Sequence, residues 1–281
     1  MSNNYSLYSL CVLFIGIQLS ACTNRGSSSV NKITTISGRY VNYTFLDQIR
    51  NSIIGHIDVS CYEMNFISAD SVAFNWNGWE EGYKCAYKKE GDHYRLFTRA
   101  FGADNDLLFT LNQDGSIVLA DSTMMRRSLN SVFRHVDSEV SLDYLINQKT
   151  IAGTYTLFKN DEPTKVKVVF MPNGKVVGLE KFTRYSICYA GDCVQMPLTF
   201  SNVIDLYPDN YREHVHKESY LSDSGEVVHG LSTSIENPAT MCAFTLEDNN
   251  EKIVKIYRLG NSPKDTKGDM PIKELLFDLR Q

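Results

Sequence analysis

Three histidines in the second half of the chain are spaced so that they could hold a metal ion. His214 and His216 are separated by one residue and lie between two glutamates, and His229 follows further along. On a β-strand, residues two apart project from the same face, so both imidazoles could reach one cation. His229 would then supply a third ligand. The segment 207–230 is polar and loop-like, so the alternative is that the histidines are simply solvated on a surface hairpin.

A second group of residues could recognise a sugar. Both tryptophans lie in the stretch 74–79 (FNWNGW), and Trp79 follows a glycine that favours a turn. Aromatic rings beside asparagine and glutamate can stack on a sugar ring while the polar groups bind its hydroxyls. Trp79 and Tyr83 are therefore weak candidates for an exposed aromatic surface that binds glycans or host molecules, and packing in a core or at its rim is the alternative.

Motifs that carry catalysis are missing from the sequence. It contains no G-x-S-x-G, no H-E-x-x-H, no phosphate-binding G-x-x-x-x-G-K-[ST] and no G-x-G-x-x-G. We therefore expect a protein that is not an enzyme and that carries no cofactor. An envelope hydrolase is the less favoured alternative, and it would need titratable groups that converge in a cleft.

The N-terminus is typical of an exported protein. Residues 1–9 are polar and residues 10–19 (LCVLFIGIQL) are apolar. A helix of that length spans about 15 Å, half of a roughly 30 Å hydrocarbon core, so it fits a signal peptide better than a membrane-spanning helix. The next residues, LSAC at 19–22, resemble the lipobox of bacterial lipoproteins. The resemblance implies removal of residues 1–21 and attachment of fatty acyl chains such as palmitate at Cys22.

The lipobox resemblance also implies a location. Two or three acyl chains anchor a protein durably in a membrane, and Thr23 after the cysteine favours the outer membrane of the cell envelope. Residues 22–35 are rich in serine and would form a flexible tether. The leader has no Lys or Arg before its apolar run, so a soluble secreted protein is the alternative. The net charge of -5 gives no general attraction to nucleic acid.

Five cysteines remain beyond the leader and the anchor. Export places them in an oxidising compartment, where disulfides can form. We predict the pairs Cys61–Cys85 and Cys188–Cys193 and leave Cys242 unpaired. Cys188 and Cys193 bracket a tight-turn sequence that could bring them within bridging distance. The alternatives are a bridge from Cys242 to Cys188 or Cys193, and buried reduced thiols. A zinc site is not expected because no C-x-x-C pair is present.

The sequence pattern predicts that the candidate site residues lie on or between β-strands. Apolar and polar residues alternate over 72–76, 83–87 and 94–98, and the turn NQDG at 112–115 separates two further alternating runs. In the second half, the runs 165–170 and 175–179 flank MPNG. Alternation interrupted by Asn-Gly or Asp-Gly is typical of antiparallel hairpins.

One helix is predicted, and it lies between two similar halves. The sequence SLDYLINQK at 141–149 begins with a serine suited to an N-cap and places three apolar residues, Leu142, Leu145 and Ile146, on one face. The pattern I-x-G-x-Y occurs at 36–40 and again at 151–155. We therefore predict a first β-domain over 36–136, a helical connector over 137–150 and a second β-domain over 151–281.

The G-x-Y motifs at 38–40 and 153–155, each followed by strand-like runs, resemble lipocalin-like envelope lipoproteins of the Bacteroidetes type. The resemblance implies an all-β fold of two tandem lipocalin-like antiparallel β-barrel or sandwich domains, with an aromatic residue closing each core. Binding residues vary in this family, so none is transferred. A single larger sandwich or an irregular two-lobed β-protein is the alternative fold.

The expected function is that of a membrane-anchored, non-catalytic lipoprotein that binds a small ligand, a glycan or a protein partner, or serves as a structural module. An open apolar cavity would favour a small ligand. A filled core would favour interactions at the surface or a purely structural role.

Overall fold

The computed structural model describes most of the chain beyond the N-terminal segment. The described residues are 36–50, 52–54, 57, 59, 61–75, 83–97, 107–121, 129–189, 202–221, 227–248, 251–259 and 272–281. At 74–75, 83, 121, 129, 217–221, 227–231, 248 and 272–273 only the backbone is described.

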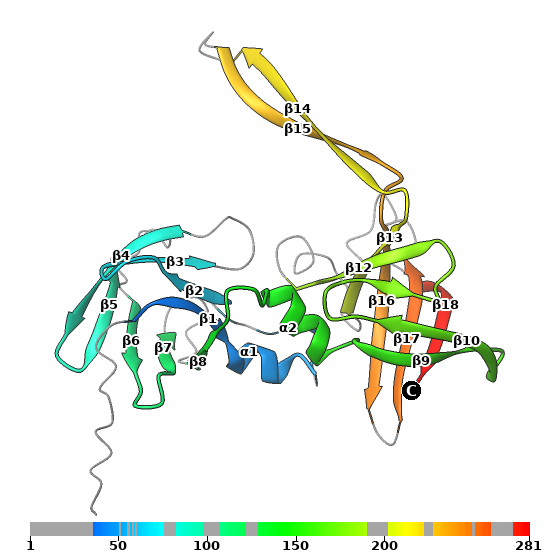
Figure 1. Cartoon of the computed structure of the whole chain (residues 1–281), viewed down its shortest axis with the longest axis horizontal. Coiled ribbons are helices and arrows are strands. Elements are labelled where there is room, and N and C mark those ends of the chain that lie inside the picture. The colour runs from blue at the N-terminus through cyan, green and yellow to red at the C-terminus, as the bar shows by residue number, and fades with distance from the viewer. Residues whose placement is uncertain are drawn as a thin grey trace, which may run out of the picture. The chain divides into compact units, whose positions relative to one another are not determined.

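The first half of the described chain forms a closed barrel of antiparallel strands (Figure 1). Its strands are β1 (Gly38–Asn42), β2 (Glu63–Phe66), β3 (Ser71–Asn75), β4 (Tyr83–Glu90), β5 (His93–Phe97), β6 (Leu107–Leu111), β7 (Ile117–Asp121) and β8 (Leu129–Val136). Each strand pairs with the next, and β8 returns to pair with β1, where Tyr40 lies opposite His135. The barrel is therefore of the up-and-down type.

Alternation along the strands decides which side chains enter this barrel. In β6, Leu107 and Phe109 are buried, whereas Leu108 and Thr110 between them are exposed. The predicted turn at 112–115 joins β6 to β7, and Gly115 there adopts a positive φ of 81°, which glycine reaches without steric cost.

The second half forms an eight-stranded antiparallel sheet. Its strands are β9 (Gly153–Lys159), β10 (Glu162–Phe170), β11 (Val176–Val177), β12 (Phe182–Cys188), β13 (Asn202–Pro208), β16 (Thr240–Asp248), β17 (Lys252–Leu259) and β18 (Ile272–Arg280), paired in the order β11-β10-β9-β18-β17-β16-β13-β12. A single bridge between Lys175 and Arg184 joins the two ends of the sheet, beside a 2.7 Å bond from the Tyr185 amide to the Gly174 carbonyl. This second barrel is nearly closed.

Together the two sheets confirm the predicted fold class. The protein is all-β, with two tandem lipocalin-like antiparallel β-barrel domains joined by a short helix. The alternative of a single larger sandwich is wrong, because the strands of each half pair only within their own sheet.

A long ribbon interrupts the second barrel. The strands β14 (Arg212–Leu221) and β15 (Val227–Glu236) pair with each other in a separate two-stranded sheet inserted between β13 and β16. His214 and His216 therefore lie on an exposed hairpin, as the alternative to a metal site expects, although the segment is a regular ribbon and not a loop. Polar residues occupy both faces of the ribbon, and even Val215 and Ile235 are 63% and 51% exposed, so the alternation that marks a half-buried strand is absent here.

The predicted connecting helix is confirmed as α2 (Leu142–Lys149). Ser141 caps it, since its hydroxyl accepts a 3.0 Å hydrogen bond from the Tyr144 amide. Leu142 and Ile146 are buried and Leu145 packs against the same core. Among the described residues, no helix combines the length and apolar character needed to cross a bilayer.

A second helix, α1 (Tyr43–Gln48), follows β1 directly and was not expected from the sequence. Its N-cap is Asn42, whose side-chain oxygen accepts a 2.9 Å bond from the Phe45 amide and whose nitrogen donates to the Cys61 carbonyl. This helix has only six residues, too few to display the 3.6-residue period by which a helix is recognised.

One hydrophobic cluster includes residues of both halves. Phe45, Leu46 and Ile49, from α1 and its C-cap, belong to the same buried cluster as Tyr155, Phe170 and further residues of the second sheet. The cluster is supported by a 2.7 Å hydrogen bond from the Ile54 amide to the Asn202 side chain and by an ion pair between Lys149 of α2 and Asp47 of α1. The segment inserted after β1 thus contributes to the core of the second barrel.

The two I-x-G-x-Y motifs take equivalent positions. Gly38 begins β1 and Gly153 begins β9, the first strand of each sheet. The tyrosines that follow, Tyr40 and Tyr155, are 5% and 1% exposed and each lies in the core of its own sheet. Both tyrosines of the repeated motif are therefore core residues.

Candidate functional site

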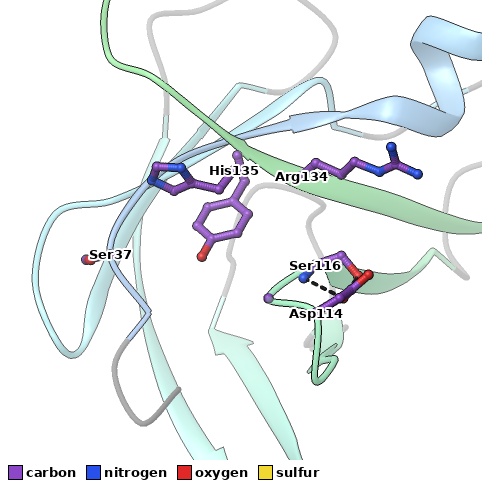
Figure 2. Close-up of a pocket in the computed structure, with 7 residues that line it drawn as sticks. Ser37, Asp114, Ser116, Arg134 and His135 are labelled. Atoms are coloured by element: carbon purple, nitrogen blue, oxygen red, sulfur yellow. Dashed lines mark hydrogen bonds between the residues drawn. The ribbon is translucent and has the colours of Figure 1, made fainter. Parts of the chain in front are cut away.

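A cavity of about 690 Å³ opens at one rim of the first barrel (Figure 2). Three segments meet there: the start of β1, the turn between β6 and β7, and the end of β8. The lining residues are Ser37, Tyr40, Asp114, Gly115, Ser116, Arg134 and His135. The volume is typical of sites for small molecules, which measure about 300–1,000 Å³. Most of the lining residues are polar, but polar and apolar atoms contribute about equally to the lining surface.

The β6–β7 turn provides a rigid polar wall. One oxygen of Asp114 accepts hydrogen bonds from the Ser116 amide at 2.9 Å and from the Ser116 hydroxyl at 2.7 Å. Asn112 donates to the same hydroxyl at 2.9 Å. The bonds from Ser116 hold the pKa of Asp114 below its usual range, so this exposed carboxyl is ionised at neutral pH.

On another side of the cavity, Tyr40 and His135 meet edge to face. Their ring centroids are 5.3 Å apart and their planes are inclined at 85°. They come from directly paired positions of β1 and β8, so they share one face of the sheet. Burial raises the pKa of the Tyr40 phenol, which keeps it protonated and able to donate a hydrogen bond.

Gly38 makes room for the imidazole of His135. A Cβ atom at this position would lie 2.7 Å from Nε2 of His135, and Gly38 also adopts a positive φ of 82°. The positive φ favours glycine at the start of β1, and the absence of a Cβ lets the imidazole lie directly over it.

Arg134 and Ser37 complete the outer part of the cavity. Both are exposed, and Ser37 immediately precedes Gly38. The guanidinium of Arg134 lies 4.8 Å from the centroid of the Tyr43 ring in a cation–π contact. Arg134 also contributes to the lowered pKa of Asp114, so one positive and one negative group lie near each other.

The structure does not bring the three predicted metal-binding histidines together. His214 and His216 share a face of the ribbon with ring centroids 6.4 Å apart, but His214 pairs with Glu236 at 3.7 Å and His216 bonds Ser234 at 2.8 Å. His229 lies opposite Ser219 in the strand ladder. Successive ladder positions alternate between the two faces of the ribbon, and this position is out of phase with those of His214 and His216. Within the described part of the chain, no group of three or more His, Cys, Asp or Glu residues could hold a metal ion.

The predicted disulfide between Cys61 and Cys85 is wrong, because the two sulfur atoms are not bonded to each other. Cys61 instead donates a hydrogen bond to the Glu63 carbonyl. Cys242 is free and buried, which removes its bridge to Cys188 or Cys193. Burial raises the pKa values of Cys85 and Cys242 to about 11, so these thiols are protonated and poorly reactive.

The second predicted pair remains a prediction. Cys188 is disulfide-bonded, but Cys193 lies outside the described residues. The same holds for Trp79 and Cys22, and of Tyr83 only the backbone at the start of β4 is described. The proposed aromatic surface and the lipidation site are therefore neither confirmed nor contradicted.

The residues of the rim cavity were not recognised in the sequence as a site. Tyr40 was expected only as a core residue, and His135 is a single histidine in a strand with no motif around it. The residue that could have pointed to this site is Gly38. A glycine at the start of a buried strand indicates that another group approaches the backbone closely there.

Comparisons with known proteins identify no relative of this chain. No protein-family model matches it, nor does any curated protein or any solved structure. Function is therefore inferred from the described residues and the sequence alone.

Proposed function

We propose that the protein is a non-catalytic lipoprotein of the cell envelope, anchored through a lipidated Cys22, that binds its partner molecules at its surface rather than inside a barrel. The observation that carries this proposal is the packing of aromatic side chains against one another inside both barrels. An eight-stranded barrel is just wide enough for its own side chains to fill it, or to hold one small ligand when they do not.

Aromatic rings fill the first barrel. Tyr94 and Phe109 are stacked with centroids 4.9 Å apart, and Phe66 contacts Tyr87 edge to face at 5.2 Å. Phe66 also contacts Tyr40 at 5.5 Å. All five residues are less than 10% exposed, so they occupy the volume in which a lipocalin-like barrel would hold an apolar ligand.

The second barrel is filled in the same way. Phe170 contacts Tyr155 and Tyr185 edge to face at 6.1 and 5.0 Å. The hydroxyl of Tyr185 donates to the Met171 carbonyl at 2.8 Å, which leaves this buried polar group satisfied. Because aromatic side chains pack against one another in the described interior of both barrels, we place binding at the rims, the loops and the exposed ribbon.

The envelope location is supported by the sequence. The apolar run at 10–19, the LSAC motif at 19–22 and the serine-rich segment after it have the order of a lipoprotein leader, an acylation site and a tether. The disulfide at Cys188 fits an oxidising compartment. Outer-membrane placement remains part of the proposal.

Membrane anchoring is tested by substituting the acylated residue in the full chain, expressed in a Gram-negative host. We expect the wild-type protein to incorporate radioactive palmitate and to sediment with membranes, whereas Cys22→Ala loses the label and no longer sediments with them. Cys85→Ala is the matched control, because Cys85 is a free thiol within the barrel and its removal leaves labelling unchanged. An unlabelled wild-type protein that retains residues 1–21 by mass spectrometry would contradict the proposal.

A further inference from the structure

The two tyrosines of the repeated I-x-G-x-Y motif differ in what their hydroxyls contact. In the second barrel, the hydroxyl of Tyr155 donates a 2.7 Å hydrogen bond to the carbonyl of Ile151, within its own motif. In the first barrel, the hydroxyl of Tyr40 makes no hydrogen bond to any residue that the structure describes, although Tyr40 is only 5% exposed. It lines the rim cavity instead.

His135 explains this difference. In the second barrel, the space above Gly153 is taken by the tyrosine of the same motif, whose hydroxyl oxygen would lie 3.3 Å from an added Cβ. In the first barrel, the corresponding space above Gly38 is taken by the imidazole of His135. His135 therefore occupies the place from which Tyr40 could reach its own backbone, and the phenol is directed to the cavity.

Among the described residues, the buried side-chain atom without a hydrogen-bond partner is Oδ1 of Asn147, so the Tyr40 hydroxyl is not sealed in the core but faces the cavity. The first barrel thus presents a hydroxyl to a cavity large enough for a ligand, whereas in the second barrel the same motif satisfies its tyrosine internally. The orientation of the Tyr40 hydroxyl toward the cavity is therefore specific to the first barrel and is not imposed by the fold.

We propose that the rim cavity of the first barrel binds a neutral saccharide unit, with the Tyr40 hydroxyl as a hydrogen-bond partner inside the cavity. An anion would meet the carboxylate of Asp114, a cation would meet Arg134, and an apolar molecule would leave the polar lining unsatisfied. The lining combines hydroxyls at Ser37 and Tyr40 with an imidazole and a carboxylate (Figure 2).

A sugar matches this set because each of its hydroxyls both donates and accepts hydrogen bonds. The carboxylate of Asp114 accepts only, a phenol or serine hydroxyl does both, and an imidazole presents one donor and one acceptor when neutral. The turn that carries Asp114 is already rigid through its bonds to Ser116, so little ordering is needed on binding. This inference rests on the proposed surface-binding role and names its ligand class.

The test is saturation-transfer NMR on the full-length chain in detergent, with glucose, galactose, mannose and N-acetylglucosamine as probes. We expect saturable binding of at least one sugar, and we expect Tyr40→Phe to weaken it about fivefold, as the loss of one hydrogen bond implies. Tyr155→Phe is the matched control: it removes the equivalent hydroxyl from the second barrel and leaves sugar binding unchanged. His135→Ala, at an exposed position, is a second variant expected to weaken binding.

Several outcomes would overturn the proposal. These are no saturable binding of any probe up to about 100 mM, equal affinity of the wild type and Tyr40→Phe, or Tyr40-dependent binding of inorganic phosphate, acetate or a fatty acid in place of a sugar. If the sugars fail to bind while palmitate labelling at Cys22 succeeds, only the ligand class is lost and the envelope role stands.

Discussion

His135 lies over Gly38 in a way that no other residue type at position 38 would allow. Two effects act at this glycine: its positive φ of 82° and the 2.7 Å separation that an added Cβ would have from Nε2 of His135. A side chain at position 38 would have two different consequences. The strained backbone would lower the free energy of unfolding, whereas the close contact would only push the imidazole of the exposed His135 aside. The glycine therefore determines where His135 lies more than whether the barrel folds.

Replacing Gly38 with alanine separates these effects. We expect Gly38→Ala to cost about 1–2 kcal/mol for the left-handed backbone and to displace His135, seen as a shift of its imidazole NMR signals. Gly91→Ala is the control, since Gly91 has a φ of 62° and nothing within 4 Å of its added Cβ. It should lose similar stability in chemical denaturation and leave His135 unmoved. Unchanged His135 signals in Gly38→Ala would refute the contact.

Individual residues were predicted unevenly, for reasons that follow from the range of the interactions. The Ser141 cap was predictable because a cap acts within three residues of its own helix. The lack of a bridge between Cys61 and Cys85 was not predictable, because bridging depends on how the segment before β2 and the strand β4 lie in space, which local sequence does not determine. The contact of Tyr40 with His135 depends on closure between β1 and β8, which lie at opposite ends of the first domain.

Among the elements, the strands of the barrels were recognisable because one face of each is buried. The same reasoning failed for β14 and β15, where neither face is buried and the residues read as a polar loop. It failed again for α1, which ends before its periodicity can appear. Strand pattern thus predicted the barrels, and it could not predict elements that bury no face or that are very short.

We expect the ribbon to be dispensable for folding of the second barrel. The strands on either side of it, β13 and β16, already pair directly, with Leu206 opposite Thr240. The described ribbon residues belong to neither hydrophobic cluster. A loop of two to five residues is enough to join two such strands.

Excision of the ribbon tests this. Replacing residues 209–237 with a four-residue Asn-Gly-type turn should leave the thermal unfolding midpoint within about 3 °C of the parent, a change of less than 1 kcal/mol for a chain of this size. Circular dichroism provides the measurement. A loss of cooperative unfolding would show that the ribbon supports the barrel, and would remove it as a free binding element.

On the scale of the whole molecule, the two barrels are coupled through the cluster that α1 shares with the second sheet. Phe45 lies 6.3 Å from the Tyr189 ring and 4.8 Å from the Tyr62 ring, and the Tyr62 hydroxyl donates to the Tyr189 carbonyl. A substitution in α1, next to the first barrel, should therefore destabilise the core of the second barrel.

Thiol labelling of Cys242 measures this coupling. Cys242 is fully buried in the second sheet, so alkylation reports opening of that sheet. Phe45→Ala should raise its labelling rate at least tenfold, because truncating a buried phenylalanine costs about 3–5 kcal/mol. Leu108→Ala, an exposed apolar residue of the first barrel, is the control and should leave the rate unchanged. No effect of Phe45→Ala would show that the two sheets open independently.

The early position of α1 in the chain has a consequence for biogenesis. Its apolar side chains leave the ribosome long before β18, whose Leu279 belongs to the same cluster. At about 5–20 residues per second, the interval is on the order of ten seconds or more. During that time the nascent chain exposes an apolar segment that can aggregate with other chains. We therefore expect it to need a chaperone that binds unfolded chains until translation finishes.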